Sequence, residues 1–288
     1  DMLWFDAMSY EVLARKYRPI DFNEVIGQDH VVKALINSIN QEKIHQAFIF
    51  SGTRGIGKTT IARILAKCLN CESSSKPTPD PCNECSNTKE ISTGRSVDFL
   101  EIDAASNTQV EKIRDLIETV EYKPAKARFK IYLIDEVHML SPASFNALLK
   151  TLEEPPPHVI FIFATTNPEK IPKTVQSRCL QLNLKTVDEE ILSSHLKKIL
   201  EKEKINYDND SVSLIANTAN GSVRDGLTLL DQAIAYGNGE LLKEDVKALL
   251  GTIDNSLLIE LIGSVIDGNG KKTFDLLSQI EELTPEYD

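Results

Sequence analysis

The sequence of 288 residues has no long hydrophobic run, no basic leader and no excess of positive charge. No apolar stretch approaches the roughly 20 residues that a membrane-spanning helix needs, which argues against a transmembrane protein. Residues 1–7 have neither a basic flank nor a long apolar core, so we do not expect a secretory signal there. Because Met8-Ser9-Tyr10 is typical of a natural start, we expect residues 1–7 to be an added remnant.

Acidic residues outnumber basic ones by 43 to 32, which gives a formal net charge of −11. This balance disfavours a protein that simply coats nucleic acid. The acidic excess lies mainly at the two ends, because residues 8–250 hold 30 basic and 33 acidic side chains. A near-neutral body can still present a local basic face, so contact with nucleic acid stays open.

Only five cysteines occur, an odd number, and four of them crowd into residues 68–85. Without an export signal, this pattern favours metal binding over disulfides. Cys71, Cys82 and Cys85 are spaced C-x10-C-x2-C, and their thiolates could converge on one tetrahedral Zn²⁺. Cys68 lies three residues before Cys71 near the end of a predicted helix, so it can face the same side and is the candidate fourth ligand. A loop with free or oxidised thiols is the alternative, and Cys179 is expected to pack in a strand.

Short β-rich runs alternate with helical patterns up to about residue 184, which is typical of βαβ units and a parallel sheet. From residue 187 to about residue 250 the apolar spacing is helical, and Asp188 is a candidate N-cap. The predicted fold class is therefore α/β, with a five-stranded parallel sheet followed by a small helical domain. The expected strands lie at residues 47–50, 97–102, 130–134, 159–163 and 179–182.

Residues 52–59, Gly-Thr-Arg-Gly-Ile-Gly-Lys-Thr, match the phosphate-binding pattern G-x-x-x-x-G-K-[ST]. The glycines let the backbone turn its N–H groups around phosphate oxygens, and the helix that begins near Lys58 directs its positive dipole end at the same anion. We expect Lys58 to reach the β- and γ-phosphates and the Thr59 hydroxyl to ligate Mg²⁺. A glycine-rich turn without a ligand is disfavoured, because the loop follows a β-rich run and opens a helix.

The predicted strand at residues 130–134 is followed by two carboxylates, Asp135 and Glu136. A buried strand does not tolerate such a pair unless something compensates the charge. Ligands bind at the carboxyl edge of a parallel sheet, where Mg²⁺ and water would compensate it. We expect Asp135 to support the metal and Glu136 to deprotonate the water that attacks the γ-phosphate. Together with the loop, this pair predicts NTP hydrolysis.

Several sequence blocks occur in the order typical of one family. They are residues 10–19 (YEVLARKYRP), 51–60 (SGTRGIGKTT), 101–106 (EIDAAS), 135–140 (DEVHML), 145–156 (FNALLKTLEEPP), 177–179 (SRC) and 221–225 (GSVRD). Through them, residues 8–283 closely resemble the gamma/tau family of bacterial DNA polymerase III clamp-loader subunits, which are AAA+ ATPases. The resemblance implies an AAA+ α/β domain over residues 8–186 and a helical lid domain over 187–250. Residues 251–288 would begin a helical collar domain that continues in the full protein.

The resemblance also implies roles for matching positions. Arg178 resembles an arginine finger that reaches the γ-phosphate held by a neighbouring subunit, and Arg224 resembles a second sensor of the subunit's own nucleotide. Thr166 resembles the first sensor beside the attacking water, with Thr165 as the alternative register. Taken without the resemblance, each could be an ordinary surface or strand-end residue. The implied nucleotide-binding set, whose first five members line the adenine pocket, is Ala14, Tyr17, Arg18, Pro19, Ile26, Gly52, Thr53, Gly55, Ile56, Gly57, Lys58, Thr59, Thr60 and Arg224.

The cysteine cluster resembles the zinc module that this family inserts after the first helix of the AAA+ domain, here at about residues 68–90. The fourth family cysteine falls at Thr88 in this sequence. This departure matters because structural zinc sites are nearly always four-coordinate. Zinc with Cys68 as the fourth ligand and a loop without zinc both remain open.

A run of basic residues and two helix starts give a weak signal for DNA. The family implies that helix N-termini near residues 106–109 and 141–144 follow the phosphate backbone of primer–template DNA. An ordinary solvated helix face is the alternative. The six bases of the run are Lys112, Arg114, Lys123, Lys126, Arg128 and Lys130.

The implied activity is ATP hydrolysis by a motor subunit that loads a sliding clamp onto primed DNA in replication, with DNA synthesis left to other parts of the polymerase III holoenzyme. ATP, Mg²⁺ and structural Zn²⁺ are the implied cofactors. The implied partners are the delta and delta-prime subunits, further copies of this chain and the clamp, while polymerase and helicase would bind only a missing C-terminal region. The implied location is the bacterial cytoplasm at the nucleoid, with no membrane contact. A different AAA+ machine, such as a branch-migration helicase, and a non-hydrolysing scaffold are the alternatives.

Overall fold

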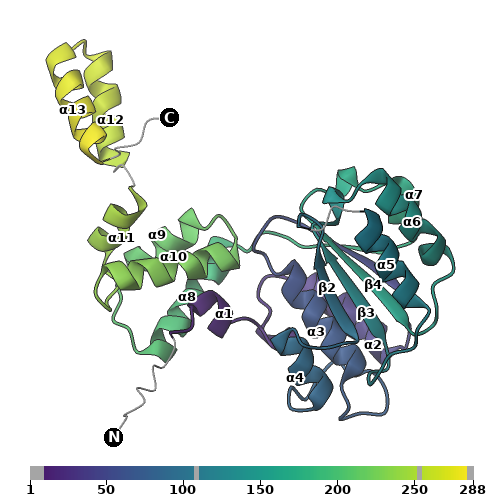
Figure 1. Cartoon of the computed structure of the whole chain (residues 1–288). Coiled ribbons are helices and arrows are strands. Elements are labelled where there is room, and N and C mark those ends of the chain that lie inside the picture. The colour runs from purple at the N-terminus through teal and green to yellow at the C-terminus, as the bar shows by residue number, and fades with distance from the viewer. Residues whose placement is uncertain (1–9, 107–109, 252–254, 284–288) are drawn as a thin grey trace, which may run out of the picture. The chain divides into compact units, whose positions relative to one another are not determined.

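The computed structural model of the protein describes residues 10–106, 110–251 and 255–283 (Figure 1). The chain divides into two units, each described by itself. The sheet unit comprises residues 14–191 and 221–224, and the helical unit comprises the described parts of residues 1–13, 192–220 and 225–288. Within the described ranges, every helix falls short of the length and apolarity that crossing a bilayer requires.

Five parallel strands form the sheet unit, and this confirms the predicted fold class. They are β1 Ala47–Ser51, β2 Phe99–Asp103, β3 Lys130–Asp135, β4 Val159–Thr165 and β5 Leu180–Asn183. The strand order is β2-β3-β4-β1-β5, and every neighbouring pair is parallel. The carboxyl ends of β1, β3 and β4 are therefore neighbours at one edge of the sheet.

The three central strands are buried along their length. Every residue of β1 and β4 is buried, and in β3 only Asp135 is partly exposed. The edge strands β2 and β5 instead alternate between more and less exposed residues. A parallel sheet that is covered on both faces produces this pattern.

Helices cover both faces of the sheet (Figure 1). Successive residues of a strand serve opposite faces, so that Phe48 and Phe50 pack in one core while Ala47 and Ile49 pack in the other. The first core holds α2 Asp29–Asn40, α3 Lys58–Asn70 and α4 Ser86–Thr93, and the second holds α5 Val110–Val120, α6 Pro142–Glu153 and α7 Lys173–Gln176. Shorter helical turns are α1 Leu13–Lys16, Phe22–Glu24, Val137–Met139 and Pro168–Lys170.

Strand β2 begins at Phe99, two residues later than the sequence pattern suggests. Asp98 is buried, and its carboxylate accepts hydrogen bonds from three consecutive backbone N–H groups, at 2.7 Å from Ala125, 2.8 Å from Lys126 and 2.9 Å from Ala127. The side chain thus fixes the loop that leads into β3.

Among the described residues of the helical unit, helices make up the regular structure apart from one isolated bridge between Tyr207 and Leu241. Leu196, Ile215 and Leu230 are fully buried in it. The helices from residue 189 onward are α8 Glu189–Glu203, α9 Asn209–Thr218, α10 Val223–Tyr236, α11 Lys243–Leu250, α12 Asn255–Ile266 and α13 Gly270–Leu283.

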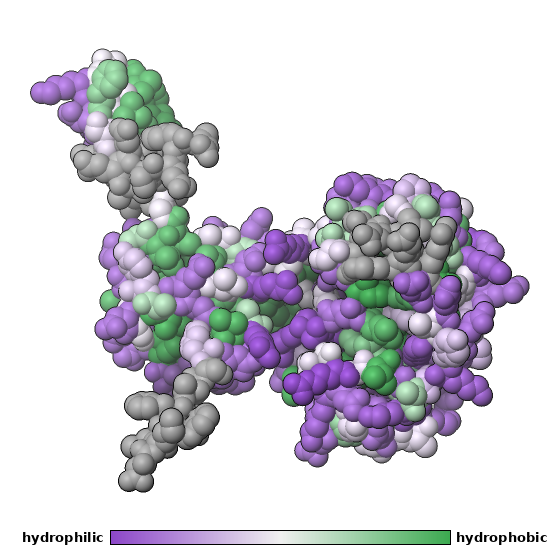
Figure 2. Space-filling view, viewed as in Figure 1, coloured by the Kyte–Doolittle hydropathy of each residue, from purple (hydrophilic) through white to green (hydrophobic). Residues whose placement is uncertain are grey.

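Helices α12 and α13 pack on each other as a hairpin, with Ser264 Oγ 2.9 Å from Thr273 Oγ1. Large apolar side chains remain at its surface (Figure 2), and Ile259, Ile266 and Phe274 are 70%, 79% and 72% exposed. The described part of the chain therefore leaves one apolar face of this hairpin uncovered.

We expect Asp98→Ala to lower the free energy of unfolding by about 2–4 kcal/mol, because it leaves three backbone N–H groups without their carboxylate acceptor. Chemical denaturation measures this change. The matched control is Asp115→Ala, an exposed acid on α5, which should change stability by less than about 0.5 kcal/mol. Equal effects of the two substitutions would contradict the role given to Asp98.

Candidate functional site

The loop between β1 and α3, residues 52–57, is fixed by close backbone contacts. The Gly52 N–H donates to the Thr165 carbonyl at 3.2 Å. A Cβ on Gly52 would lie 2.7 Å from the Leu184 carbonyl oxygen, and its φ of +144° also disfavours other residues. Ile56 is buried in the core beneath the loop. Only glycine therefore suits the first position of the motif.

The same loop offers backbone donors to an anion. Within the described residues, no N–H of residues 53–57 donates to a backbone carbonyl. Gly57 has a φ of +107° and precedes α3, and a Cβ added there would meet no atom within 4 Å. Free N–H groups, open space and a helix N-terminus together suit a phosphate group. The residues present thus fit a nucleotide.

Lys58, the first residue of α3, is buried, with 6% of the residue exposed. Its Nζ donates to the carbonyl oxygens of Gly52 and Thr53, both at 2.8 Å. Burial lowers the pKa of Lys58, while the negative charges of Glu136 and Asp135 act in the opposite direction. The ammonium group is thus hydrogen-bonded to the loop, and it is attracted electrostatically by the carboxylates of Asp135 and Glu136 at the end of β3.

One hydrogen bond joins the loop to the acidic strand end. Thr59 Oγ1 donates to Asp135 Oδ2 at 2.9 Å, and Asp135 Oδ1 accepts the Glu136 N–H at 3.0 Å. A hydroxyl and a carboxylate are oxygen ligands of the kind that Mg²⁺ takes. The structure therefore brings together the two residues that the sequence assigns to the metal.

Glu136 follows β3 in a left-handed conformation with φ +47°, which is strained for a residue with a side chain. Its Oε2 accepts from Thr166 Oγ1 at 3.1 Å and from the Thr166 N–H at 3.3 Å. The Thr165 hydroxyl is buried and instead contacts the Asn167 N–H and His138 Nδ1, each at 3.0 Å. Of the two possible registers for the first sensor, the contact with Glu136 is made by Thr166.

His138 is a neighbour of Glu136 to which sequence reasoning gave no role. Its Nδ1 lies 3.4 Å from Glu136 Oε2 and 3.0 Å from Thr165 Oγ1, and its side chain is 8% exposed. The only signal in the sequence is a polar residue two positions after Glu136, inside a short helical turn. Such a signal does not reveal which way the ring points.

Positive charges gather around the loop. Arg18 Nε donates to Thr60 Oγ1 at 3.2 Å, and burial together with the charges of Arg63 and Arg224 lowers the pKa of Arg18 to about 10. The Arg224 N–H donates to the Gly55 carbonyl at 3.2 Å, and the Arg224 charge also lowers the pKa of Lys58. Cations that disfavour one another in this way are stabilised by a polyanionic ligand.

The remaining predicted adenine-pocket residues, Ala14, Tyr17, Pro19 and Ile26, are partly buried in the sheet unit. Arg178 lies elsewhere on that unit, since its guanidinium pairs with Glu153 at 2.6 Å and donates to the Thr174 carbonyl at 2.6 Å. Within the described residues, these partners keep Arg178 out of the group formed by the loop and the acidic strand end. Hydrogen bonds join Thr59 to Asp135, Asp135 to Glu136, and Glu136 to Thr166.

Three of the six bases in the run have partners within the protein. Lys130 Nζ is turned inward to the Thr119 carbonyl at 2.8 Å, and Lys126 pairs with Glu90 at 3.0 Å. The Arg128 guanidinium donates to the carbonyls of Leu69, Cys71 and Ser74. Lys130 and Arg128 are thus bound to backbone carbonyls, while Lys126 stays at the surface, and contact of this run with DNA stays a prediction.

Of the two helix starts predicted to contact DNA, the structure describes only the one at residues 141–144 in full. Residues 107–109 and the side chains of Lys112 and Arg114 lie outside the described residues. At the other start, the Ser141 side chain caps its own helix by accepting the Ser144 N–H at 3.1 Å. One donor of that helix end is therefore already satisfied within the protein.

Comparison with known proteins matches two consecutive parts of the chain to two family models. Residues 27–188 match the family model "DNA polymerase III, delta subunit", and residues 191–239 match "DNA polymerase III clamp loader subunit, ATPase lid domain". The gamma subunit of DNA polymerase III from Buchnera aphidicola subsp. Acyrthosiphon pisum is 50% identical over 281 residues, which cover 98% of this chain and 77% of that protein. The chain belongs to the gamma/tau family of DNA polymerase III subunits.

Tau subunits of the same family are longer than this chain. Those of Salmonella typhimurium and Escherichia coli are each 53% identical over 272 residues, which cover 94% of this chain and 42% of each tau protein. The chain thus spans about two fifths of their length. In fold, the Thermotoga maritima RuvB Holliday junction branch migration motor is similar, with a TM-score of 0.61 over 86% of this chain and 79% of that chain, at 18% identity.

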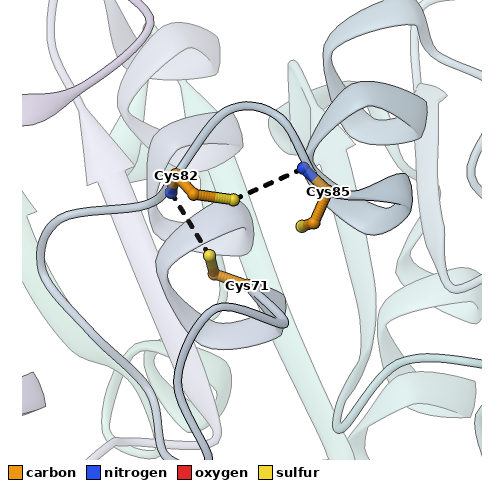
Figure 3. Close-up of side chains that lie close together, drawn as sticks. All are labelled: Cys71, Cys82 and Cys85. Carbon is orange, nitrogen blue, oxygen red and sulfur yellow. Dashed lines mark hydrogen bonds between the residues drawn. The ribbon is translucent and has the colours of Figure 1, made fainter.

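The gamma/tau chain also brings three cysteines together (Figure 3). The Sγ atoms of Cys71, Cys82 and Cys85 all lie within 4.8 Å of one another. Cys71 Sγ accepts the Cys82 N–H at 3.3 Å, and Cys82 Sγ accepts the Cys85 N–H at 3.4 Å. Hydrogen bonds from the backbone of Glu84 and Cys85 lower the pKa of Cys82 to about 6. Thiolates arranged like this suit a soft metal ion such as Zn²⁺.

Cys68, the candidate fourth ligand, lies outside this cluster. It is fully buried, and its thiol donates to the Pro79 carbonyl at 3.4 Å. Burial raises the pKa of Cys68 well above its usual value, which disfavours the thiolate that a metal needs. Cys179 lies one residue before β5 and not in the strand, but it packs against the second core, and burial raises its pKa to about 12.

We expect Asp135→Asn to keep the hydrogen bond with Thr59 but to lose the charge that holds Mg²⁺. Nucleotide affinity of the wild type should rise when Mg²⁺ is added, and the variant should lose about tenfold or more of that gain. The matched control is Asp103→Asn at the end of the neighbouring strand, because the Asp103 carboxylate is bonded to Ala105 and Ser106 instead. If Asp135→Asn responds to Mg²⁺ like the wild type, Asp135 is not a metal ligand.

Proposed function

We propose that this chain is the ATP-hydrolysing motor of a replicative clamp loader. The observation that supports this best is the 2.9 Å hydrogen bond between Thr59 and Asp135, because it joins the phosphate-binding loop to the acidic strand end. Lys58 lies on the same loop, and Glu136 follows Asp135 directly. A loop that only bound phosphate would not require this combination.

In the proposed reaction, the loop N–H groups and Lys58 Nζ bind the β- and γ-phosphates of ATP. Lys58 would exchange its two carbonyl partners for phosphate oxygens. Thr59 and Asp135 would hold the Mg²⁺ that neutralises phosphate charge when it is bound. These residues orient the triphosphate at the carboxyl edge of the sheet.

Glu136 would act as the general base. One proton of the attacking water passes to the Glu136 carboxylate as the water oxygen bonds to the γ-phosphorus and ADP leaves. The hydrogen bonds from Thr166 to Oε2 fix where this carboxylate lies, and the His138 ring borders it. We therefore propose Thr166 as the first sensor and His138 as a positioning residue.

Two arginines would supply further charge. Arg224 is bonded through its backbone to the loop at Gly55, which supports a role as second sensor of the same nucleotide. Arg178 is bound to Glu153 on the surface and lies outside that group, which suits a finger presented to the nucleotide of a neighbouring subunit. Hydrolysis would then depend on assembly.

The proposed cargo of the motor is a ring-shaped clamp, which it places on primer–template DNA. The DNA would be contacted through its phosphate backbone. We propose delta and delta-prime subunits and further copies of this chain as partners, in the bacterial cytoplasm at the nucleoid. Binding of polymerase and helicase would belong to sequence beyond this chain. The domain boundaries proposed for these tasks are residues 8–186, 187–250 and 251–288.

We also propose that Cys71, Cys82 and Cys85 bind a Zn²⁺ ion that stabilises the loop between α3 and α4. Three sulfur atoms within 4.8 Å and backbone N–H donors to two of them support this proposal. These residues lie outside the proposed catalytic group, so the zinc would have no part in hydrolysis.

We expect Glu136→Gln to bind ATP with wild-type affinity and to lower the rate of phosphate release by about 10²–10⁴-fold, because the amide cannot take a proton from water. A steady-state phosphate assay and a nucleotide-binding titration measure the two effects. Glu154→Gln, which changes an exposed carboxylate at the end of α6, is the control and should retain the wild-type rate. Normal turnover by Glu136→Gln would remove Glu136 from the mechanism.

We expect Arg178→Ala to leave the nucleotide affinity of the isolated subunit unchanged and to lower the ATPase rate of the assembled clamp loader by up to about a thousandfold. Loss of its exposed pair with Glu153 should cost less than about 1 kcal/mol of stability. Lys173→Ala on α7 serves as the control for lost surface charge. A similar defect with and without partner subunits would contradict action across an interface.

A further inference from the structure

The cysteine cluster has three sulfur atoms within 4.8 Å of one another and, among the described residues, no fourth cysteine sulfur beside them. Three protein ligands are unusual for a structural zinc site. Building on the zinc binding proposed above, we propose that the metal is held by three thiolates only, with its fourth coordination position open to an exchangeable oxygen or nitrogen ligand beside the Thr88 hydroxyl. The site would then resemble a catalytic zinc centre in its coordination, although no reaction is assigned to it.

Thr88 occupies the corner that a fourth ligand would take. Its Oγ1 lies 3.2 Å from Cys85 Sγ and 4.0 Å from Cys82 Sγ, and the residue is fully buried. The same hydroxyl donates to the Cys85 carbonyl at 3.1 Å. A neutral threonine hydroxyl is not among the usual zinc ligands, but its oxygen can accept a hydrogen bond from a water bound there.

Other side chains near the cluster do not complete it. Ser73 Oγ lies 3.0 Å from Cys71 Sγ, but Ser73 is exposed and reaches only that one sulfur. Cys68 is turned to the Pro79 carbonyl, and Cys179 packs in the second core. A fourth thiolate is therefore not available from the five cysteines, all of which are described.

The loop that carries the cluster is held by protein groups as well. Arg128 donates to the carbonyls of Cys71 and Ser74, and buried Lys67 donates to Asn83 Oδ1 at 3.0 Å. These bonds fix both ends of the cluster without metal. Removal of the metal should therefore leave the chain folded, unlike in domains that only a metal holds together. A site of this kind can exchange its metal and its fourth ligand.

The test uses the purified, reduced protein stripped of metal and loaded with Co²⁺, which reports its ligands through visible absorption. We expect one Co²⁺ per chain in the wild type, with thiolate charge-transfer bands, and a shift of the visible bands when imidazole is added, because imidazole enters the open position. Thr88→Cys should give a four-thiolate spectrum that does not respond to imidazole. It should also retain Zn²⁺ against a chelator about tenfold better or more.

Two controls separate the alternatives. Cys68→Ala and Ser73→Ala should each behave like the wild type. A wild-type spectrum that imidazole does not change, together with loss of metal in Cys68→Ala, would overturn the open position and restore Cys68 as a ligand. Metal bound by Thr88→Cys but not by the wild type would overturn the three-thiolate site. Absence of metal in both would overturn zinc binding altogether, while the ATPase rate of the same samples would still report on the nucleotide site.

Discussion

All five strands of the sheet run in the same direction, and β4 lies between β3 and β1, so the carboxyl ends of these three strands lie next to one another. Thr59 follows β1 by way of the loop, Asp135 ends β3 and Thr166 follows β4. The central strands are buried along their length, and each of them ends in a polar residue, Ser51, Asp135 or Thr165. The hydrogen bond between Thr59 and Asp135 depends on that geometry, and so does the proposed motor.

The nucleotide site collects groups that are costly for the fold. Glu136 has a left-handed backbone, for which about 1–3 kcal/mol is typical, and Lys58 is a buried cation with a lowered pKa. Arg18 and Arg224 add charges that disfavour one another. A sheet covered by helices on both faces supplies the apolar burial that outweighs these costs. A bound polyanion would offset the repulsion among these cations.

Local pattern predicted the fold well, because the three buried central strands leave a largely continuous apolar signal in the sequence. It failed where a side chain makes a contact far away in sequence. Asp98 binds the loop at residues 125–127, Arg128 binds the loop at residues 69–74, and Cys68 turns to Pro79 instead of Cys71. Such directions depend on which elements pack together, and spacing along one helix does not contain that information.

The sequence by itself determined the phosphate-binding loop and the acidic strand end, because each rests on residues adjacent in the chain, and it determined the family through blocks that follow a fixed order along the chain. The tertiary structure alone decided that Thr166 and not Thr165 contacts Glu136, that His138 borders the same carboxylate, and that three cysteines meet without the fourth. The physical reason is that the sequence gives only the identity of each residue and its spacing along the chain. A hydrogen bond or a metal site needs atoms within a few ångströms of one another, and the packing of separate elements brings them that close.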